Sequence, residues 1–187
     1  MWLLDLTGDL GIPVFAAVSH RTDGAEERIL YGFGAHTDPR IAALRSVCEL
    51  NQMLPAYDVQ DLDDPETRGS WLGQWLKEAR IAEHPHLAPD PGAAGRRMTD
   101  YPVPDTENVR DDIEHCRALV ERKGLELLVL DQTRPDIGMP VARAIVPGLR
   151  HFWPRFAPGR LYDVPVEMGW TEGPLAETEL NPFTIGG

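Results

Sequence analysis

Two short apolar runs rich in β-forming residues, followed directly by a capped amphipathic helix, constrain this chain more than any other feature. The runs cover residues 11–20 and 28–34, and a turn signal at Asp23-Gly24 lies between them, so they predict a β-hairpin. Asp38 can cap a helix whose first residue is Pro39. Apolar residues at helical spacing predict that this helix runs from residue 40 to about 53 and stops at Pro55. Its expected buried face consists of Ile41, Leu44, Val47 and Cys48.

The rest of the chain alternates between further strand and helix signals. An acidic, proline-rich insertion is expected over about residues 55–106, with one amphipathic helix near 71–79. A second helix is predicted from about 107 to 123 with Gly124 as its stop, followed by strands at 125–131 and 140–146. An extended arm is expected over about residues 161–187. This order predicts one α+β domain over 1–187, with a mixed, largely antiparallel sheet packed against helices.

Charge and hydropathy exclude several classes of function. The 187 residues contain 18 basic and 30 acidic side chains, a formal net charge of −12, which argues against nucleic-acid binding. No apolar run approaches the roughly 20 residues of a membrane span, so no membrane partner is expected. The two cysteines, Cys48 and Cys116, form no disulfide framework and favour a reducing, cytoplasmic location.

The helix after Asp38 carries the most informative set of polar side chains. Arg45, Glu49 and Gln52 are spaced i, i+4 and i+7, so they project from one stripe beside Ile41 and Cys48. A carboxylate there could hold Mg²⁺, and the arginine could meet a phosphate. An exposed Arg–Glu pair on a solvated helix face explains the same spacing.

Two weaker motifs have alternatives of equal merit. Gly32-Phe-Gly34 before the helix is typical of a glycine-rich anion-binding turn, and a strand end explains it equally well. His84 and His86 could bind a metal, although no third ligand stands at a recognised spacing. Trp71 and Trp75 fit core or interface anchors better than a ligand-stacking platform.

Several phrases in the chain, taken in order, resemble the C-terminal half of the YcaO family. They are GFGAHTDP at 32–39, ALRSVCELNQ at 43–52, DQTRPDIG at 131–138, VPGL at 146–149 and APGR at 157–160. The phrase LYDVPVEMGW at 161–170 and the ending LNPF at 180–183 resemble the subgroup that makes thiazolines and oxazolines in peptides. The resemblance therefore implies a YcaO-like α+β fold and a cyclodehydratase of bacteriocin biosynthesis.

The resemblance implies a specific chemistry with ATP and Mg²⁺ as cofactors. In such enzymes a Cys, Ser or Thr side chain of a ribosomal precursor peptide adds to the preceding amide carbonyl. ATP phosphorylates the resulting oxygen, and phosphate then leaves to give the azoline ring. The family's Glu-x-x-Gln motif falls on Glu49 and Gln52, and Arg45 stands where the family has an upstream arginine. These three residues are implied to bind the nucleotide, with Glu49 as a Mg²⁺ ligand.

Two departures from the family pattern shape the expected partners. The family's Ser-x-x-Glu-x-x-Glu-Arg helix is absent, so an N-terminal YcaO half or a partner subunit is expected to complete the metal site. Pro182 is followed by Phe183 where the subgroup has a proline-rich tail. We therefore expect the isolated chain to be inactive and to self-associate. The alternative is a non-catalytic docking or scaffold subunit of a bacteriocin-modification complex.

Overall fold

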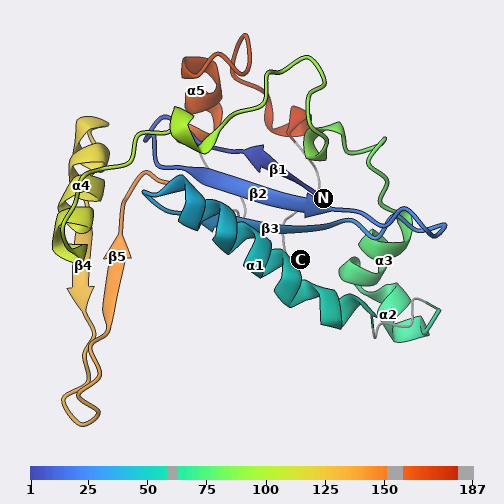
Figure 1. Cartoon of the computed structure of the whole chain (residues 1–187), viewed down its shortest axis with the longest axis horizontal. Coiled ribbons are helices and arrows are strands. Elements are labelled where there is room, and N and C mark those ends of the chain that lie inside the picture. The colour runs from blue at the N-terminus through green and yellow to red at the C-terminus, as the bar shows by residue number, and fades with distance from the viewer. Residues whose placement is uncertain (59–62, 151–157, 181–187) are drawn as a thin grey trace. The chain divides into compact units, whose positions relative to one another are not determined.

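The computed structural model describes residues 1–58, 63–150 and 158–180, which form two compact units (Figure 1). The first unit contains residues 1–8 and 12–104, and the second contains residues 9–11 and the described residues from 105 onward. The expected single domain over 1–187 and the insertion at 55–106 stay predictions. Pro182 and Phe183, where the sequence departs from the proline-rich tail of the subgroup, lie outside the described residues. Helices and antiparallel sheets make the chain α+β, as predicted.

The first unit is built on a three-stranded antiparallel meander. Its strands are β1 (Trp2–Asp5), β2 (Val14–Ser19) and β3 (Leu30–Ala35), in the order β1-β2-β3. The register pairs Ala17 with Gly32 and Phe15 with Gly34. The predicted hairpin of β2 and β3 is therefore confirmed. Strand β1 was missed because it has only four residues, WLLD, whose apolar side chains are consecutive and show no alternation.

Helix α1 (Pro39–Asp58) runs beside β3 (Figure 1). Its start agrees with the prediction, since the Asp38 carboxylate accepts the Arg40 N–H at 2.8 Å. The predicted stop at Pro55 is wrong, because Pro55 lies inside the helix. The predicted buried face is wrong for three of its four members, because Ile41, Leu44 and Cys48 are exposed. Val47 is partly buried and packs against the core, as predicted. The fully buried residues of α1 that pack against the sheet are Ala42, Ser46 and Leu50.

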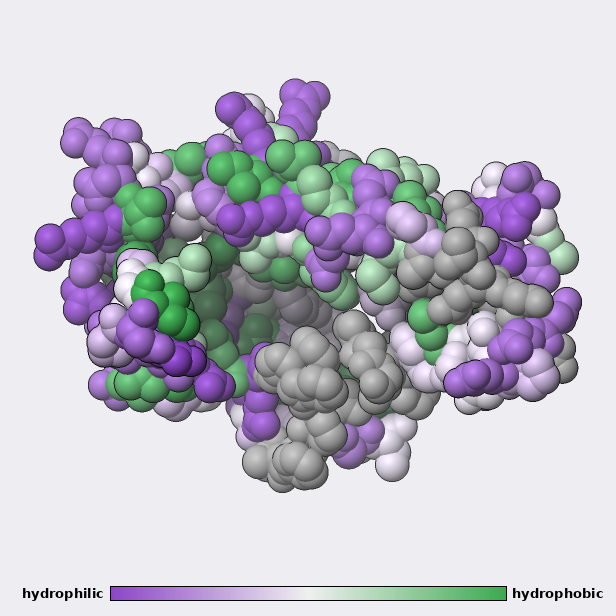
Figure 2. Space-filling view, turned by 90° about the horizontal axis from the view of Figure 1, so that it is seen from below, coloured by the Kyte–Doolittle hydropathy of each residue, from purple (hydrophilic) through white to green (hydrophobic). Residues whose placement is uncertain are grey.

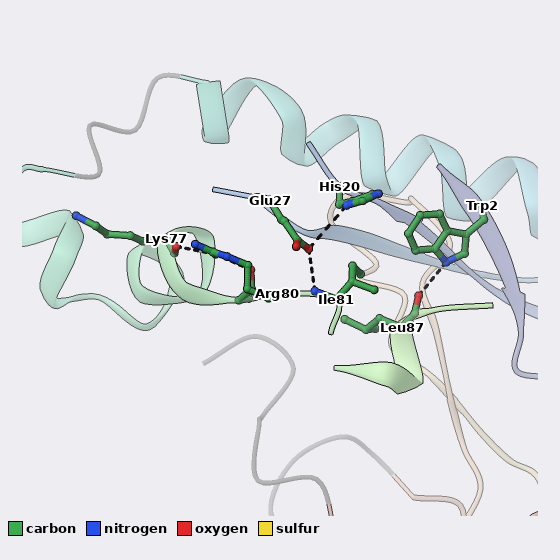
Figure 3. A network of polar contacts seen from close by, with 8 residues as sticks. Trp2, His20, Glu27, Lys77, Arg80, Ile81 and Leu87 are labelled. Atoms are coloured by element: carbon green, nitrogen blue, oxygen red, sulfur yellow. Dashed lines mark hydrogen bonds and ion pairs between the residues drawn. The ribbon is translucent and has the colours of Figure 1, made fainter. Parts of the chain in front are cut away.

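The acidic segment contributes to the core of the first unit. It contains α2 (Pro65–Gly69), α3 (Trp71–Glu78) and the 3-10 turns η1 (Pro85–Leu87) and η2 (Met98–Asp100). Trp75 is buried, as the anchor interpretation predicted, and its indole N–H donates to Ile29 O at 2.9 Å. Figure 3 shows two further hydrogen bonds of this segment, one to β1 and one to the loop between β2 and β3. The Trp2 indole donates to Leu87 O at 2.8 Å, and the Glu27 carboxylate accepts the Ile81 N–H at 2.8 Å.

The second unit contains helix α4 (Val109–Arg122), strands β4 (Leu128–Asp131) and β5 (Ala142–Ile145), helix α5 (Arg160–Glu167) and the turn η3 (Glu177–Glu179). Strands β4 and β5 form an antiparallel hairpin, so both strand predictions are confirmed. Gly124 has φ +70° directly after α4, which fits its predicted role as a helix stop. The segment expected to be extended from residue 161 instead begins with α5. Its apolar residues recur at helical spacing, as at Leu161, Val164 and Met168, and Pro165 did not prevent the helix. None of the helices in the described residues is long and apolar enough to cross a membrane.

Candidate functional site

The candidate site is the surface of α1 that flanks the outer edge of β3, and two glycines determine how closely these elements approach. A Cβ built on Gly34 would lie 2.1 Å from Ala42 O, and one built on Gly32 would lie 2.3 Å from Leu50 N. Such distances leave no room for a side chain. The two glycines therefore let the helix backbone rest directly on the strand. The anion-turn interpretation of Gly32-Phe-Gly34 is wrong, because all three residues lie inside β3.

Arg45 and Glu49 both reach from α1 to the backbone of β3. The Glu49 carboxylate accepts the Phe33 N–H at 2.6 Å, and the Arg45 guanidinium donates to Ala35 O at 3.1 Å. Within the described residues no ion pair joins Arg45 to Glu49. Each side chain therefore forms a hydrogen bond with the backbone of β3, and the two do not pair with each other. The bond from Phe33 uses one carboxylate oxygen of Glu49, so the other can still coordinate a cation.

The remaining residues of this helix face are exposed. Gln52 lies one turn beyond Glu49, and Ile41, Leu44 and Cys48 complete a surface on which apolar and polar side chains mix. Ile41, Leu44 and Cys48 recur at helical spacing, so they lie on one side of α1. An apolar patch beside polar residues is a candidate contact surface for another part of a larger protein.

The donor set fits one side of a magnesium–nucleotide site. Mg²⁺ prefers oxygen ligands and is often held by one or two carboxylates together with substrate phosphates. Glu49 offers such a carboxylate and Gln52 an amide oxygen. Among residues 1–58, 63–150 and 158–180, no group of three or more His, Cys, Asp or Glu side chains could hold a metal ion. Further ligands would have to come from outside this set.

Of the two histidines of the weaker motif, only His84 is buried, and its ring lies 4.9 Å from the Trp75 ring. His86 is exposed, and its ring lies 5.8 Å from the His84 ring. Partial desolvation, together with the neighbouring His84, lowers the pKa of His86 below its ordinary value. His84 is therefore a packing residue, and the described residues supply no third ligand for a metal at this pair.

Sequence reasoning missed a buried charge cluster in the second unit. The Asp9 side chain is only 5% exposed, its Oδ2 lies 3.2 Å from Lys123 Nζ, and its Oδ1 accepts a hydrogen bond from Arg160. Burial raises the pKa of Asp9, but the hydrogen bonds and charges of Arg160 and Lys123 outweigh it, so the pKa lies below its ordinary value. The cluster joins residues more than 110 positions apart, so no local pattern could have revealed it.

A family model described as YcaO cyclodehydratase, ATP- and Mg²⁺-binding, matches residues 1–150. The chain belongs to the YcaO family. Two relatives match this YcaO chain over most of its length. An uncharacterised protein of Methanothermobacter thermautotrophicus is 32% identical over 154 residues, which cover 80% of this chain and 39% of the relative. An uncharacterised protein in the tfuA 3′ region of Rhizobium leguminosarum bv. trifolii is 31% identical over 157 residues, which cover 79% of this chain and 36% of the relative.

Two solved heterocyclase structures are similar to this YcaO chain. One is a heterocyclase in complex with substrate and cofactor, with a TM-score of 0.91 and 48% identity over 98% of this chain. The other is the heterocyclase TruD, with a TM-score of 0.88 and 45% identity over 100% of this chain. The YcaO chain covers only 24% and 25% of those chains. These likenesses support a cyclodehydratase-related role for a region about a quarter the length of a heterocyclase.

Proposed function

We propose that this chain is the C-terminal part of an ATP-dependent YcaO cyclodehydratase that forms thiazoline or oxazoline rings in a ribosomal precursor peptide. The observation that carries the proposal is Glu49, an exposed carboxylate fixed against β3 by the Phe33 N–H within a chain that belongs to the YcaO family. In this proposal Glu49 is a Mg²⁺ ligand, Gln52 contacts the nucleotide or a metal-bound water, and Arg45 meets the phosphates.

The proposed reaction uses ATP to make an amide oxygen a leaving group. The side-chain thiol or hydroxyl of the peptide adds to the preceding carbonyl carbon. The γ-phosphoryl of ATP is transferred to the oxygen formed there, and ADP is released. Phosphate then departs from the carbon as the ring C=N bond forms. This chain would hold the metal and phosphates in place, and phosphoryl transfer depends mainly on such positioning and charge stabilisation. The remaining ligands would come from an N-terminal YcaO half, so this chain alone would be inactive.

A chimera of TruD tests the proposal. In it, this chain replaces the matching quarter of TruD, and the readout is the ATP-dependent loss of one water from a peptide with Cys, Ser or Thr, chosen because the unaltered heterocyclase converts it. Glu49→Gln should lower the rate by about 10²–10³-fold, because it removes the charge that the metal requires. The Gln amide oxygen can still accept the Phe33 N–H, so the fold should be kept.

The matched control is Glu78→Gln, the same chemical change at an exposed position of α3. It should leave the rate unchanged. If Glu49→Gln retains near-normal turnover in an active chimera, Glu49 is not a metal ligand and the proposed role of α1 fails. If the chimera assembles but never converts the peptide, the non-catalytic docking subunit becomes the better account.

A further inference from the structure

The β4–β5 hairpin of the second unit exposes apolar side chains on both of its faces. Successive residues of a strand point to opposite faces, yet Leu128, Val129 and Leu130 are 42%, 62% and 51% exposed, and Ile145 on β5 is 42% exposed. Figure 2 shows hydrophobic surface next to hydrophilic surface at its left, the side on which α4, β4 and β5 lie in Figure 1. A strand that is apolar on both faces is typical of the interior of a sheet that is covered on both sides.

The backbone of β4 also has an unpaired edge. The Gln132 N–H donates to Val141 O at 2.8 Å, and the register pairs Leu130 with Arg143. In an antiparallel pair of strands, successive residues direct their backbone N–H and C=O groups alternately toward the partner strand and away from it. Because Gln132 faces β5, the N–H and C=O of Leu130 and Leu128, two and four residues earlier, also face β5. The N–H and C=O of Val129 and Asp131 therefore point away from β5. In the described part of the chain, β4 and β5 form a sheet of two strands with no third.

We propose that the outer edge of β4 is where a further β-strand pairs, and that this strand belongs to the part of a family-length YcaO chain outside these 187 residues. The proposal rests on the proposed function, which requires such a part to complete the site. About three quarters of the length of the similar heterocyclases lies outside the matched region, which is ample chain to supply a strand and a covering layer. A two-stranded hairpin alone is only marginally stable in water, so a third strand would also stabilise β4 and β5.

A second copy of this chain fits the hairpin less well. Pairing of two β4 edges would extend the sheet to four strands but would leave both apolar faces exposed to water. Each copy also has a formal net charge of −12, so two copies repel each other. A larger partner can supply a strand that pairs with the backbone edge of β4 and a further layer that covers the apolar side chains on both faces.

The test uses a proline scan of β4 with the complementary part of TruD as the probe. The TruD residues that this chain does not match are co-expressed with this chain as a separate polypeptide, and the recovered complex is quantified by co-purification. Val129→Pro removes an outward N–H without removing a ladder bond to β5, so it should lower recovery at least tenfold. Val129→Thr keeps the N–H and the β-branched shape and should bind like the unaltered chain.

Amide hydrogen exchange gives a second readout that does not depend on a variant. In the complex the Val129 and Asp131 amides should exchange at least a hundredfold more slowly than in the isolated chain. Unchanged exchange at both amides, or equal recovery of Val129→Pro, overturns the proposal. A dimer of the unaltered chain that Val129→Pro dissolves also overturns it, in favour of a second copy. A complex that protects Val129 but does not cyclise peptide supports the pairing and counts against the proposed function instead.

Discussion

At the scale of single residues, Gly34 determines how closely α1 rests on β3. Alanine there would place its Cβ 2.1 Å from Ala42 O and 2.5 Å from Ser46 N, both of them backbone atoms that cannot yield locally. We expect Gly34→Ala to lower the unfolding free energy by about 1–3 kcal/mol or more, as overpacking does. Urea unfolding measures this. Gly8→Ala is the control, because no atom lies within 4 Å of its added Cβ, and equal losses in both variants would contradict this account.

Asp9 makes stability depend on pH in a predictable direction. Its pKa in the folded chain lies below the ordinary value, so its stabilising contribution is fully present above the unfolded pKa of about 3.9 and is lost as the pH falls from there through the lower folded pKa. We expect Asp9→Asn to cost about 1–3 kcal/mol near neutral pH, since it leaves Lys123 and Arg160 without their shared carboxylate.

Unfolding curves of both proteins across the acid range test this prediction. The difference between them should shrink as the pH falls below about 4, because Asp9 of the unfolded chain binds a proton there before Asp9 of the folded chain does. A difference that stays constant down to the lowest pH at which both fold would show that Asp9 acts through packing and not through its charge.

The sequence predicted the candidate site residues but not the close packing of α1 on β3 that places them. Arg45, Glu49 and Gln52 follow from helical spacing and the family phrase, and the structure places all three on an exposed part of α1. The role of the glycines was left open in the sequence between an anion-binding turn and a strand end, and the structure confirms the strand. Only the register of β3 against α1 shows that both positions need to lack a side chain.

At the scale of elements, the buried face of α1 shows where periodicity fails. Helical periodicity was read from the apolar residues alone, so it selected Ile41, Leu44, Val47 and Cys48, of which only Val47 packs against the core. The close approach to β3 instead admits small residues, and Ala42 and Ser46 are fully buried. Short amphipathic signals elsewhere were read correctly when a cap or a stop accompanied them, as with Gly124 after α4. Helix α5 has no side-chain cap and contains a proline, so it was predicted as extended.

Helix α3 provides a prediction for the acidic segment as a whole. Trp75, Leu76 and Ala79 belong to the same buried cluster as Ala17, Val18 and Leu30 of the sheet. Trp75→Ala should therefore cost about 3–5 kcal/mol, the range for a buried aromatic side chain. Trp71 stacks on Trp75 with ring centroids 6.0 Å apart but is only partly buried, so Trp71→Ala should cost clearly less. If both variants unfold at the same urea concentration as the unaltered chain, α3 is not part of the core.

At the scale of the whole molecule, the chain exposes the helix face for which we propose nucleotide binding, and it exposes one apolar hairpin. The exposed residues of α1 lie in the first unit and the exposed strands β4 and β5 in the second. Each unit thus carries a surface of the kind that a larger protein would cover. The chain spans only about a quarter of the similar heterocyclases, and we propose that the rest of such a protein covers these surfaces.

The isolated chain should therefore not turn over ATP. Glu49 is its proposed metal ligand, and no group of three acidic, histidine or cysteine side chains within the described residues could complete a site around it. With so few protein ligands, Mg²⁺ would be poorly positioned against the phosphates that it must bridge. Phosphate release by the purified chain should equal that of Glu49→Gln, whose charge is removed at the same place. This comparison separates the chain from contaminating ATPases, because a contaminant contributes equally to both preparations. Turnover that the unaltered chain shows and Glu49→Gln lacks would mean that these 187 residues are already a competent nucleotide site, and the need for an N-terminal half would be refuted.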